Sequence, residues 1–584
     1  METFGQLLLN SKLPEQYKFR GVVGKKDIYT NLTTMAKKDP HSYGDHVHHI
    51  KKVGDFFATN QGITVGLEDI EPDYKSRNTI IQRAKKDLSK LKGYRARQDR
   101  ILKAQDEGLQ LVSKHKGSLV QMAESGGRGN FGQLLKTLVA PISTRGPDGT
   151  PTDFLMSKSY SEGLTPSEFW MGATEARRDT ALSKLATALP GDSAKQLVNT
   201  LNKVVVTKQD CGTTNGLLMD PSDHNIIGRF LAGSTEIITD QNIKSLTQHG
   251  KKIKVRSPLT CEAQPGVCQR CYGLASNDKL LEIGTNYGIR AAQAMSEPLT
   301  QMTLSTKHGG HMAAKEGELP SGMAGFRQIM TVPQVFKNES TLALKEGRVS
   351  HIDKMPHGGY TVMIGQQEHY VSPGRNVIVK RGDYLGKGEK ISDGVPNPKA
   401  LTGLKGLGSG RKYLLDTLHK VYSSSGVDMD KRNLETLVRE DLNYVKVHKS
   451  DPEGQFLKHD VVPYNVIRPM LKKSAKSVPF DKKVIGKTLG EDYLQFTAGS
   501  EISSEMYKEM ALASPKNLQV STDVPSYTPI VTALERVPSM SQDIIGRLAH
   551  RRLKDSLIEG ASKSYVTDVK NSPVANYLFG RGNY

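Results

Sequence analysis

The four cysteines of this 584-residue chain restrict its fold more than any other feature. Cys261, Cys268 and Cys271 follow the spacing Cys-x6-Cys-x2-Cys, and Cys211 lies fifty residues upstream of the first of them. Two residues between thiolates let both face one ion, and a glycine directly after Cys211 suits a tight loop around a metal. We predict one structural zinc site with four thiolates, which leaves no coordination position open for catalysis. The alternative is a redox-active Cys-x2-Cys pair with two further buried thiols.

Length and charge indicate the class of protein. The chain is too long for one hydrophobic core, and about three to four domains of roughly 100–200 residues each are expected. No apolar run approaches the ~18–20 residues of a membrane span, the N-terminus has no signal-peptide layout, and four cysteines do not resemble a secreted disulfide framework. We expect an intracellular protein with no membrane partner. Lys and Arg number 81 against 61 Asp and Glu, and the net charge of +20 favours a nucleic-acid partner over the alternative of solubility alone.

The hydrophobic patterns predict an α+β, multidomain fold that is mainly helical and contains one small β-barrel or sandwich. Basic helices separated by Gly93 are expected over residues 73–113, a helix break at Pro190–Gly191, and a helix near Ser541–Gly560. The β-type runs RVSHI, YTVMI, HYVSP and NVIVK lie between residues 342 and 395. The predicted regions are 1–113, 114–203, 204–283, 284–330, 331–397 and 398–584.

A local histidine cluster precedes the basic helices. Its members are spaced poorly for metal ligation and have no cysteine nearby, so a solvated surface stretch is favoured over a metal site. They are His41, His46, His48 and His49.

A glycine-marked segment, Ser118–Ala140, has a helical pattern. It contains Gly126, Gly127, Gly129 and Gly132, and each glycine costs up to ~1 kcal/mol relative to alanine in a helix. Either the segment is a loop, or it is a helix of about 35 Å that bends or admits another chain close to its backbone.

A second long helical segment runs from Gly284 to His308 and contains Pro298, which kinks it or starts a new helix. Beyond the proline, Gln301, Leu304 or Ser305, and His308 fall on one face. The pair Gly309–Gly310 then permits a mobile loop, so the segment suits a gate over a substrate. An ordinary surface helix is the alternative.

Together these segments resemble one family, the largest (β′-type) subunit of multisubunit DNA-directed RNA polymerases. Five motifs occur in the family's order, and weaker similarity on both sides extends the resemblance over most of the chain. The motifs are MAESGGRGN (Met122–Asn130), VVVTKQDCGT (Val204–Thr213), VRSPLTCEAQPGVCQRCYG (Val255–Gly273), GIRAAQAMSEPLTQMTLSTKHGG (Gly288–Gly310), and ISDGVPNPKAL followed by VYSSSGVDMDKRNLETLVRE (within Ile391–Glu440).

The resemblance implies a role for the first glycine-marked segment and for the cysteines. Ser118–Ala140 is similar to the bridge helix that crosses the active cleft beside the RNA–DNA hybrid. The cysteines match the family's cleft-side zinc site, which would hold the bridge-type and trigger-type helices in register. By the same resemblance, the residues that contact nucleic acid would be Arg128, Gly126, Gly127 and Gly129.

The resemblance also implies roles for the remaining regions. Residues from Thr285 to about Gln328 resemble the trigger helices and loop, which close over the incoming nucleotide. There His308 would reach the triphosphate, Gln301 would lie near the ribose, and Leu304 would pack against a base. The other regions are similar to the helices of the secondary-channel rim (1–113), a β-rich jaw or swivel module (331–397) and a helical clamp or swivel region (398–584).

Two departures from the family pattern change the expectation. Leu304 and Ser305 stand where the bacterial pattern has Met-Arg, and Ser305 cannot supply the arginine's charge. The NADFDGD loop, whose aspartates bind the catalytic Mg²⁺, and the N-terminal clamp with its own cysteines are missing from the sequence, and Asp428-Met-Asp430 lies in a different motif. We therefore expect the C-terminal half of a naturally split β′ subunit, encoded by a phage or virus. A fragment of a longer chain is the lesser alternative, because the sequence begins with Met1 and its C-terminal end looks complete.

The expected cofactors are structural Zn²⁺ in this chain and catalytic Mg²⁺ in a partner chain. The expected partners are an N-terminal β′-like chain with the magnesium loop, β-like chains, a sigma-like or promoter-specificity subunit, the DNA template, RNA and nucleoside triphosphates. The expected locations are the cytoplasm of a bacterial host and the virion. The competing hypothesis is a non-catalytic, polymerase-derived protein that binds nucleic acid or a polymerase.

Overall fold

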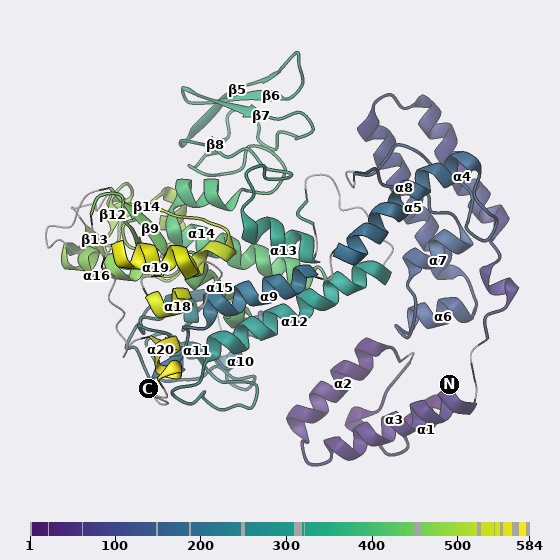
Figure 1. The fold of residues 1–584 in the computed structure, drawn as a ribbon, viewed down its shortest axis with the longest axis horizontal. Coiled ribbons are helices and arrows are strands. Elements are labelled where there is room, and N and C mark those ends of the chain that lie inside the picture. The colour runs from purple at the N-terminus through teal and green to yellow at the C-terminus, as the bar shows by residue number, and fades with distance from the viewer. Residues whose placement is uncertain are drawn as a thin grey trace. The chain divides into compact units, whose positions relative to one another are not determined.

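The structure is a computed structural model in which the chain forms two units. The first unit is Met1–Ala186 with Leu304–Ala313, and the second is Thr187–Thr303 with Ala314–Tyr584. Figure 1 shows the ribbon of both. The predicted division into six regions stays a prediction. The structure describes residues 3–21, 23–60, 62, 64–147, 150–185, 188–246, 252–308, 318–320, 322–448, 457–521, 527–541, 543–548, 553–562, 564 and 572–579.

The N-terminal part of the first unit is a small helical group. It contains α1 (Phe4–Asn10), α2 (Lys25–Lys38) and α3 (Tyr43–Asn60). Its buried hydrophobic residues are Leu13, Tyr17, Phe19 and Met35. Two histidines of the local cluster contact backbone carbonyl oxygens within this helical group. His46 Nδ1 lies 2.7 Å from the carbonyl oxygen of Ser42, and His49 Nε2 lies 3.2 Å from that of Leu8.

A pair of helices follows, as the sequence predicts. These are α4 (Tyr74–Lys90) and α5 (Tyr94–Lys114), separated at Gly93, whose φ of 100° is in the left-handed region that favours glycine. The buried side chains recur at helical spacing and include Ile81, Ala84, Leu88, Ile101, Ala104 and Val112.

The expected continuous helix over Ser118–Ala140 is wrong. The structure has α6 (Ser118–Glu124) and α7 (Phe131–Leu138), and between them lies an irregular segment, residues 125–130, which we call the glycine loop. Gly126 (φ 75°) and Gly129 (φ 73°) have left-handed backbone, which a right-handed helix cannot contain. Asn130 then caps α7 by accepting a hydrogen bond from the backbone N–H of Gln133 (2.9 Å). The alternative of a loop is therefore confirmed for residues 125–130 only, with a short helix on either side.

A longer helix, α8 (Pro166–Leu185), lies in the first unit. Glu168, in its first turn, accepts hydrogen bonds from the backbone N–H groups of Ser157 (2.6 Å) and Thr165 (3.0 Å). Desolvation opposes ionisation of this carboxyl, but the donated hydrogen bonds outweigh it and lower its pKa to about 2. Among the described side chains of α8, Glu168 is the buried one and the others are half-buried or exposed. A helix with so little apolar face gains little from packing against its own chain.

The predicted break at Pro190–Gly191 is misplaced. Both residues lie in the first turn of α9 (Ala188–Leu201), which opens the second unit. Proline is tolerated in a first turn because the N–H groups there have no intrahelical partner.

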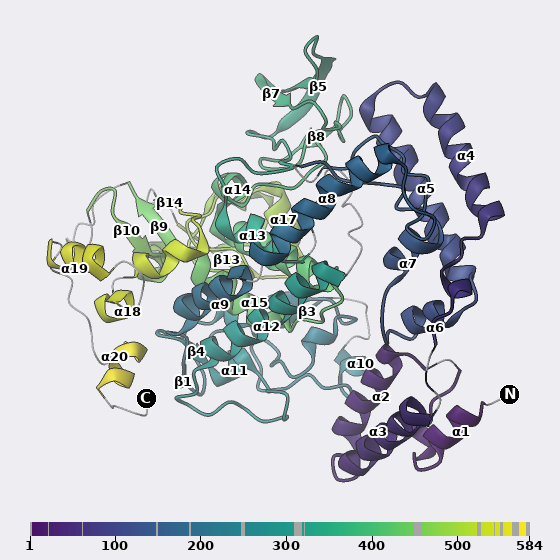
Figure 2. The same ribbon diagram turned by 45° about the vertical axis from the view of Figure 1, so that its right-hand side comes forward.

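The core of the second unit is built from four further helices. A single helix, α12 (Tyr287–His308), runs through Pro298, so the proline does not start a new helix. It is followed by α13 (Gly322–Thr331), α14 (Pro398–Ser423) and α15 (Lys431–Asp441). Helices α9, α12 and α15 lie side by side in Figures 1 and 2. Their buried residues include Leu197, Leu201, Ala291, Met295, Leu299, Leu434 and Val438.

Short strands and helices carry the cysteine region. The strand β1 (Val206–Lys208) pairs in parallel with β4 (Val267–Cys268), and β2 (Leu217–Met219) pairs antiparallel with β3 (Ile253–Val255). The helices here are α10 (Ile243–Leu246) and α11 (Gln269–Tyr272). Three-residue or longer 3-10 turns occur in this region and elsewhere, at Glu15–Tyr17, Leu67–Ile70, His224–Ile226, Pro258–Thr260, Lys482–Val484 and Leu534–Met540.

Residues 342–395, the β module, contain one four-stranded antiparallel sheet in the order β7-β6-β5-β8. The predicted barrel or sandwich is therefore reduced to a single curved sheet. The fourth predicted run, residues 376–380, forms no strand, and Val377 makes only an isolated bridge to Ser392. The strands are β5 (Gly347–Lys354), β6 (Tyr360–Ile364), β7 (Gln367–Val371) and β8 (Tyr384–Leu385).

The C-terminal region is less helical than expected, because it contains two three-stranded sheets. One has the order β10-β9-β14 and the other β11-β13-β12. The strands are β9 (Tyr444–Val447), β10 (Val461–Pro463), β11 (Ala475–Pro479), β12 (Thr488–Leu489), β13 (Asn517–Ser521) and β14 (Tyr527–Pro529). The helices are α16 (Tyr464–Lys473), α17 (Ser504–Ala511), α18 (Ile544–Leu548), α19 (Leu553–Ser562) and α20 (Pro573–Leu578).

The single helix expected near Ser541–Gly560 corresponds to two helices, α18 and α19. Across the described ranges, no helix combines the length and apolar character that crossing a membrane requires.

Candidate metal centre

The loop after β1, the end of the 3-10 turn Pro258–Thr260 and the turn that joins β4 to α11 bring the four cysteines together. Parallel pairing aligns Lys208 with Cys268, so that Cys211, three residues beyond Lys208, comes close to the Cys-x2-Cys pair. Cys268 ends β4 and caps α11, and Cys271 lies within that short helix. Gly266, with φ 80°, has the carbonyl oxygen of Val205 at the place a side chain would occupy, so only glycine permits this approach of the two strands.

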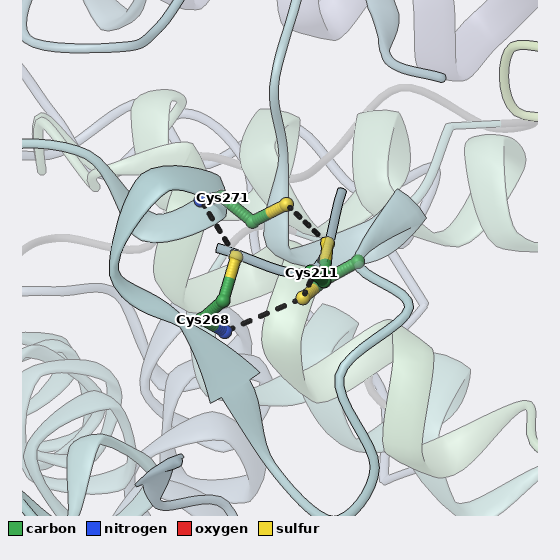
Figure 3. Close-up of side chains that lie close together, drawn as sticks. Cys211, Cys268 and Cys271 are labelled. Atoms are coloured by element: carbon green, nitrogen blue, oxygen red, sulfur yellow. Dashed lines mark hydrogen bonds between the residues drawn. The ribbon is translucent and has the colours of Figure 1, made fainter. Parts of the chain in front are cut away.

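The geometry of the four sulfurs fits a tetrahedral metal ion. Figure 3 shows three of these cysteines, Cys211, Cys268 and Cys271, close together. All four Sγ atoms lie within 4.8 Å of one another, with Cys211 at 3.6 Å from Cys271 and 3.8 Å from Cys261. A disulfide needs about 2.05 Å between sulfurs. Four thiolates at about 2.3 Å from one zinc ion lie about 3.8 Å apart, so the observed spacing suits a shared ion. The alternative of a redox pair with two separate thiols is not favoured, because all four sulfurs converge.

Backbone N–H groups point at the sulfurs, as a thiolate site requires. Cys261 Sγ accepts from the N–H of Ala263 and of Cys268, each at 3.4 Å, and Cys268 Sγ accepts from the N–H of Cys271 at 3.3 Å. Three of the cysteines are buried and Cys211 is half-buried. Hydrogen bonds to a buried sulfur favour its anionic form.

The cluster also sets its own protonation. Hydrogen bonds from the Cys261, Cys268 and Cys271 thiols lower the pKa of Cys211. Burial raises the pKa of the Cys261 and Cys271 thiols. Metal binding must therefore displace protons from the buried thiols, which makes affinity dependent on pH.

A guanidinium that the sequence reasoning missed lies against the cluster. Arg256 Nε lies 3.3 Å from Cys271 Sγ, and its Nη2 lies 3.3 Å from Cys211 Sγ, 3.7 Å from Cys268 Sγ and 2.6 Å from an Asp210 carboxylate oxygen. The motif VRSPLTC contains this arginine, but its spacing from the cysteines shows no ligand pattern. Only the fold reveals the contact.

Helix α15 is joined to the cysteine region by a buried ion pair. Arg229 and Glu435 have 0% and 1% of their side chains exposed and form two hydrogen bonds, of 2.6 and 2.9 Å. Ser257 Oγ donates a third hydrogen bond to Glu435 (2.6 Å). From the next turn, Arg439 donates to the carbonyl oxygens of Pro258 (3.3 Å) and Ala263 (3.1 Å), on both sides of Cys261.

The acidic pair before α15 is engaged in local structure. Asp428 pairs with His224 at 2.9 Å. Asp430 caps α15 and pairs with Arg432 at 2.7 Å. The two carboxylates thus contact different partners.

The base of α12 is fixed to the same core, in the second unit. Tyr287 Oη donates to Asn433 Oδ1 (2.9 Å), and Tyr422 Oη donates to the carbonyl oxygen of Met295 (2.9 Å), close to Pro298. Gln301 is exposed and its amide donates to Glu297 Oε1 (2.7 Å). The side chains of the other predicted gate residues, Leu304, Ser305 and His308, lie outside the described ones, as do residues 309–317.

The predicted nucleic-acid contacts lie in the first unit. Arg128 and its neighbours Gly126, Gly127 and Gly129 are exposed in the glycine loop. The backbone N–H of Lys25 donates to the carbonyl oxygen of Ser125 (3.1 Å), so the start of α2 holds one end of the loop. The four predicted residues are therefore brought together on one exposed turn.

The sequence matches one protein family over about half of its length. The model of the family described as RNA polymerase Rpb1, domain 5, matches residues 163–458. The match covers α8, the four cysteines, α12, the β module and α15, and it begins after the glycine loop.

Curated relatives agree with this match. A DNA-directed RNA polymerase subunit beta′ of Symbiobacterium thermophilum is 26% identical over 76% of this chain and 41% of its own. The subunit beta′ of Clostridium tetani is 28% identical over 77% of this chain and 44% of its own, and that of Chloroflexus aurantiacus is 26% identical over 77% and 39%. The chain thus spans about two fifths of the length of these relatives.

Proposed function

The chain belongs to the family of RNA polymerase Rpb1, domain 5, and from that premise we propose that it is the C-terminal part of the β′ subunit of a multisubunit, DNA-directed RNA polymerase. In this role it contributes a metal-stabilised scaffold and a nucleotide gate to template-directed RNA synthesis. The observation that carries the proposal is the family match over residues 163–458, which takes in both the cysteine cluster and α12.

The cysteine cluster holds structural Zn²⁺ in this proposal. Cys211, Cys261, Cys268 and Cys271 supply the four thiolates, and no position is left for substrate. A bound ion would join the loop after β1 to the β4–α11 turn. Since Arg439 and the Arg229–Glu435 pair tie the same region to α15, the ion stabilises the platform on which the base of α12 rests.

The far end of α12 is the nucleotide gate. We assign His308 to the triphosphate, Gln301 to the ribose and Leu304 to the base of the incoming nucleotide. A histidine donor at the triphosphate stabilises the charge that develops on the leaving pyrophosphate. The support is the fixed, buried base of α12 together with the exposure of Gln301 in its C-terminal half.

The cleft-crossing helix is reassigned from Ser118–Ala140 to α8. Its 20 residues span about 30 Å, at ~1.5 Å per residue. It buries little of its own surface within the described chain, as a helix that faces nucleic acid or a partner subunit must. The glycine loop keeps a proposed role beside it, with Arg128 contacting a phosphate and the glycines allowing close approach to the backbone.

The catalytic Mg²⁺ belongs to another chain. The sequence has no NADFDGD loop, and Asp428 and Asp430 are engaged with His224 and Arg432. The proposed partners are an N-terminal β′-like chain with the magnesium loop, β-like chains, a promoter-specificity subunit, DNA, RNA and nucleoside triphosphates. We further propose a split, phage-encoded enzyme that acts in the cytoplasm of the host. The support is the departure at Leu304-Ser305 and the lack of large insertions.

Reconstitution tests the proposal. The gene neighbourhood is searched for a chain with the magnesium loop, which is then co-expressed with this chain and with β-like chains. The expected result is a stable complex with Mg²⁺-dependent, template-directed RNA synthesis, whereas this chain alone is inactive. A complex that binds DNA but never extends RNA would favour the competing hypothesis of a non-catalytic binding protein.

The gate assignment has its own test in the reconstituted complex. His308→Ala is expected to slow nucleotide addition by about 10²-fold, in the range for removing a positioned acid or donor, without loss of assembly. His357→Ala, at an exposed turn between β5 and β6, is the control and leaves the rate unchanged. Single-nucleotide addition by rapid quench measures both. An unchanged rate in His308→Ala contradicts the assignment.

A further inference from the structure

Arg256 is a buried cation whose contacts are mostly sulfur. Only 4% of its side chain is exposed, and it donates to Cys271 Sγ and Cys211 Sγ at 3.3 Å and to Cys268 Sγ at 3.7 Å. These donors come from one planar group that spans one face of the sulfur cluster. A lysine in this place would be a single point charge, whereas a guanidinium can contact several acceptors at once.

The carboxylate beside Arg256 does not balance its charge alone. Asp210 binds Arg256 at 2.6 Å and also binds Arg270 at 2.8 Å. Two guanidinium groups therefore share one carboxylate. A buried charge without compensation is costly, so neutral thiols would leave Arg256 poorly compensated.

Thiolate sulfurs would balance the excess positive charge of the two guanidinium groups. Four thiolates around one divalent ion carry a net charge of 2−, and Arg256 lies where that charge is concentrated. Its hydrogen bonds draw electron density from three of the sulfurs and hold their positions. Asp210 in turn fixes the orientation of the guanidinium.

We propose that Arg256 is a positioning residue of the metal centre, which offsets the charge of the four thiolates and slows the loss of a thiophilic divalent cation such as Zn²⁺. This inference rests on the proposed metal binding by the four cysteines. The backbone N–H donors to Cys261 and Cys268 belong to the loops themselves, whereas Arg256 reaches the cluster from the segment after β3. The site is thereby linked to the β2–β3 pair.

The experiment measures metal loss from the purified full-length chain. Zinc content is determined by atomic emission, and zinc transfer to an excess of a chromophoric chelator gives the release rate. Arg256→Gln is expected to release zinc about 10- to 100-fold faster than wild type, the range for residues that orient metal ligands. Arg256→Lys keeps the charge but loses the planar group, so its rate is expected between the two. Arg270→Gln is the matched control, because Arg270 shares Asp210 but donates no hydrogen bond to a cysteine sulfur within the described part of the chain. Its release rate is expected to stay within about twofold of wild type.

Cobalt substitution supplies a second readout that remains available if Arg256→Gln does not fold. In the Co²⁺-loaded chain, the sulfur-to-cobalt charge-transfer band of Arg256→Lys is expected to shift relative to wild type, while that of Arg270→Gln does not. Release from Arg256→Gln as slow as from Arg270→Gln overturns the role of Arg256, and so does an unshifted band in Arg256→Lys with an unchanged release rate. A wild-type chain that neither contains nor takes up stoichiometric zinc overturns the metal centre itself.

Discussion

His369 in the β module makes a pair of contacts that only a neutral imidazole satisfies. The backbone N–H of Leu344 donates to His369 Nε2 (2.9 Å), while Nδ1 lies 3.1 Å from the carbonyl oxygen of Gln367 and so carries the proton. Desolvation lowers the pKa of His369 below its usual value of 6.5. The unfolded chain then binds a proton more readily than the folded one, so the histidine contributes stability above pH ~6.5 that is lost as the pH falls through its folded pKa.

Local hydrogen exchange tests this expectation. Amides of β5 to β7 are expected to lose protection between pH 7 and pH 5, after correction for intrinsic exchange rates. In His369→Gln this loss of protection disappears. His351→Gln, at an exposed position of β5, is the control and behaves as wild type. Equal pH dependence in His369→Gln and wild type would refute the account.

Asp441, the last residue of α15, has the opposite dependence. Burial raises its pKa from 3.8 to about 7, and its Oδ1 has no hydrogen-bond partner within the described part of the chain. The folded state holds a proton that the unfolded state releases, so stability falls as the pH rises from about 4 to about 7. Asp441→Asn cannot ionise and is expected to be more stable than wild type at pH 8, with a smaller difference at pH 5. Urea unfolding at pH 8 and at pH 5 measures this difference in stability. Asp430→Asn is the contrasting variant, and it should be destabilised because it breaks the pair with Arg432.

At the scale of elements, the glycine loop shows how a helical pattern can mislead. Residues of Ser118–Ala140 have apolar positions at helical spacing, and both α6 and α7 form where that pattern predicts. The interruption is decided by the positive φ angles of Gly126 and Gly129 and by the contact with α2 at Lys25. The contact with Lys25 joins residues one hundred positions apart in the sequence. The spacing of apolar residues within the segment carries no information about such a contact.

Two alanine substitutions test whether residues 125–130 form a loop or part of a continuous helix. Gly126→Ala is expected to destabilise the first unit by about 1–2 kcal/mol, because alanine is strained at φ 75° and its Cβ would lie 3.3 Å from Lys25 Cβ. Gly127 has no positive φ and has ordinary space around it, so Gly127→Ala is close to neutral. A continuous helix would instead be stabilised by both changes, by up to ~1 kcal/mol each. Denaturant unfolding of the two variants decides between the alternatives.

At the scale of the whole molecule, parts of the second unit far apart in the sequence depend on one another. Arg229, Ser257 and Glu435 come from three separate segments and meet in one buried contact. The same α15 supplies Asn433 to the base of α12 and Arg439 to the loop of Cys261. The cysteine cluster, α12 and α15 therefore share one core.

Breaking that contact is expected to be costly. Glu435→Gln leaves Arg229 as a buried cation without its carboxylate, and we expect a loss of about 3–5 kcal/mol in the free energy of unfolding. Asp428→Asn weakens the contact between His224 and Asp428, whose side chains are 66% and 75% exposed, and is expected to cost less than about 1 kcal/mol. Urea unfolding of the second unit, followed by near-ultraviolet circular dichroism, measures both. Equal losses would show that the buried pair does not join these segments.

Much of the local structure was predictable from residue pattern. The α4–α5 pair, three of the four strands of the β module and the long α12 follow from hydrophobic spacing and from glycine punctuation, because these signals act within a few residues. The interruption of Ser118–Ala140, the position of the break before α9 and the two C-terminal sheets were not predicted. Short strands such as β9 and β14 are stabilised by pairing with partners that no local window contains.

For the cysteines, too, the local pattern was predictable and the long-range contacts were not. Their number, their Cys-x6-Cys-x2-Cys spacing and the glycine after Cys211 determined, from the sequence alone, that a four-thiolate metal site was the chemistry to expect. Only the tertiary structure decided that all four sulfurs converge within 4.8 Å and that Arg256 covers three of them. The physical reason is distance. Ligand spacing within a knuckle is set by a few backbone torsions, whereas the approach of Cys211, Arg256 and α15 requires strand pairing and a buried ion pair that form only when the whole second unit folds.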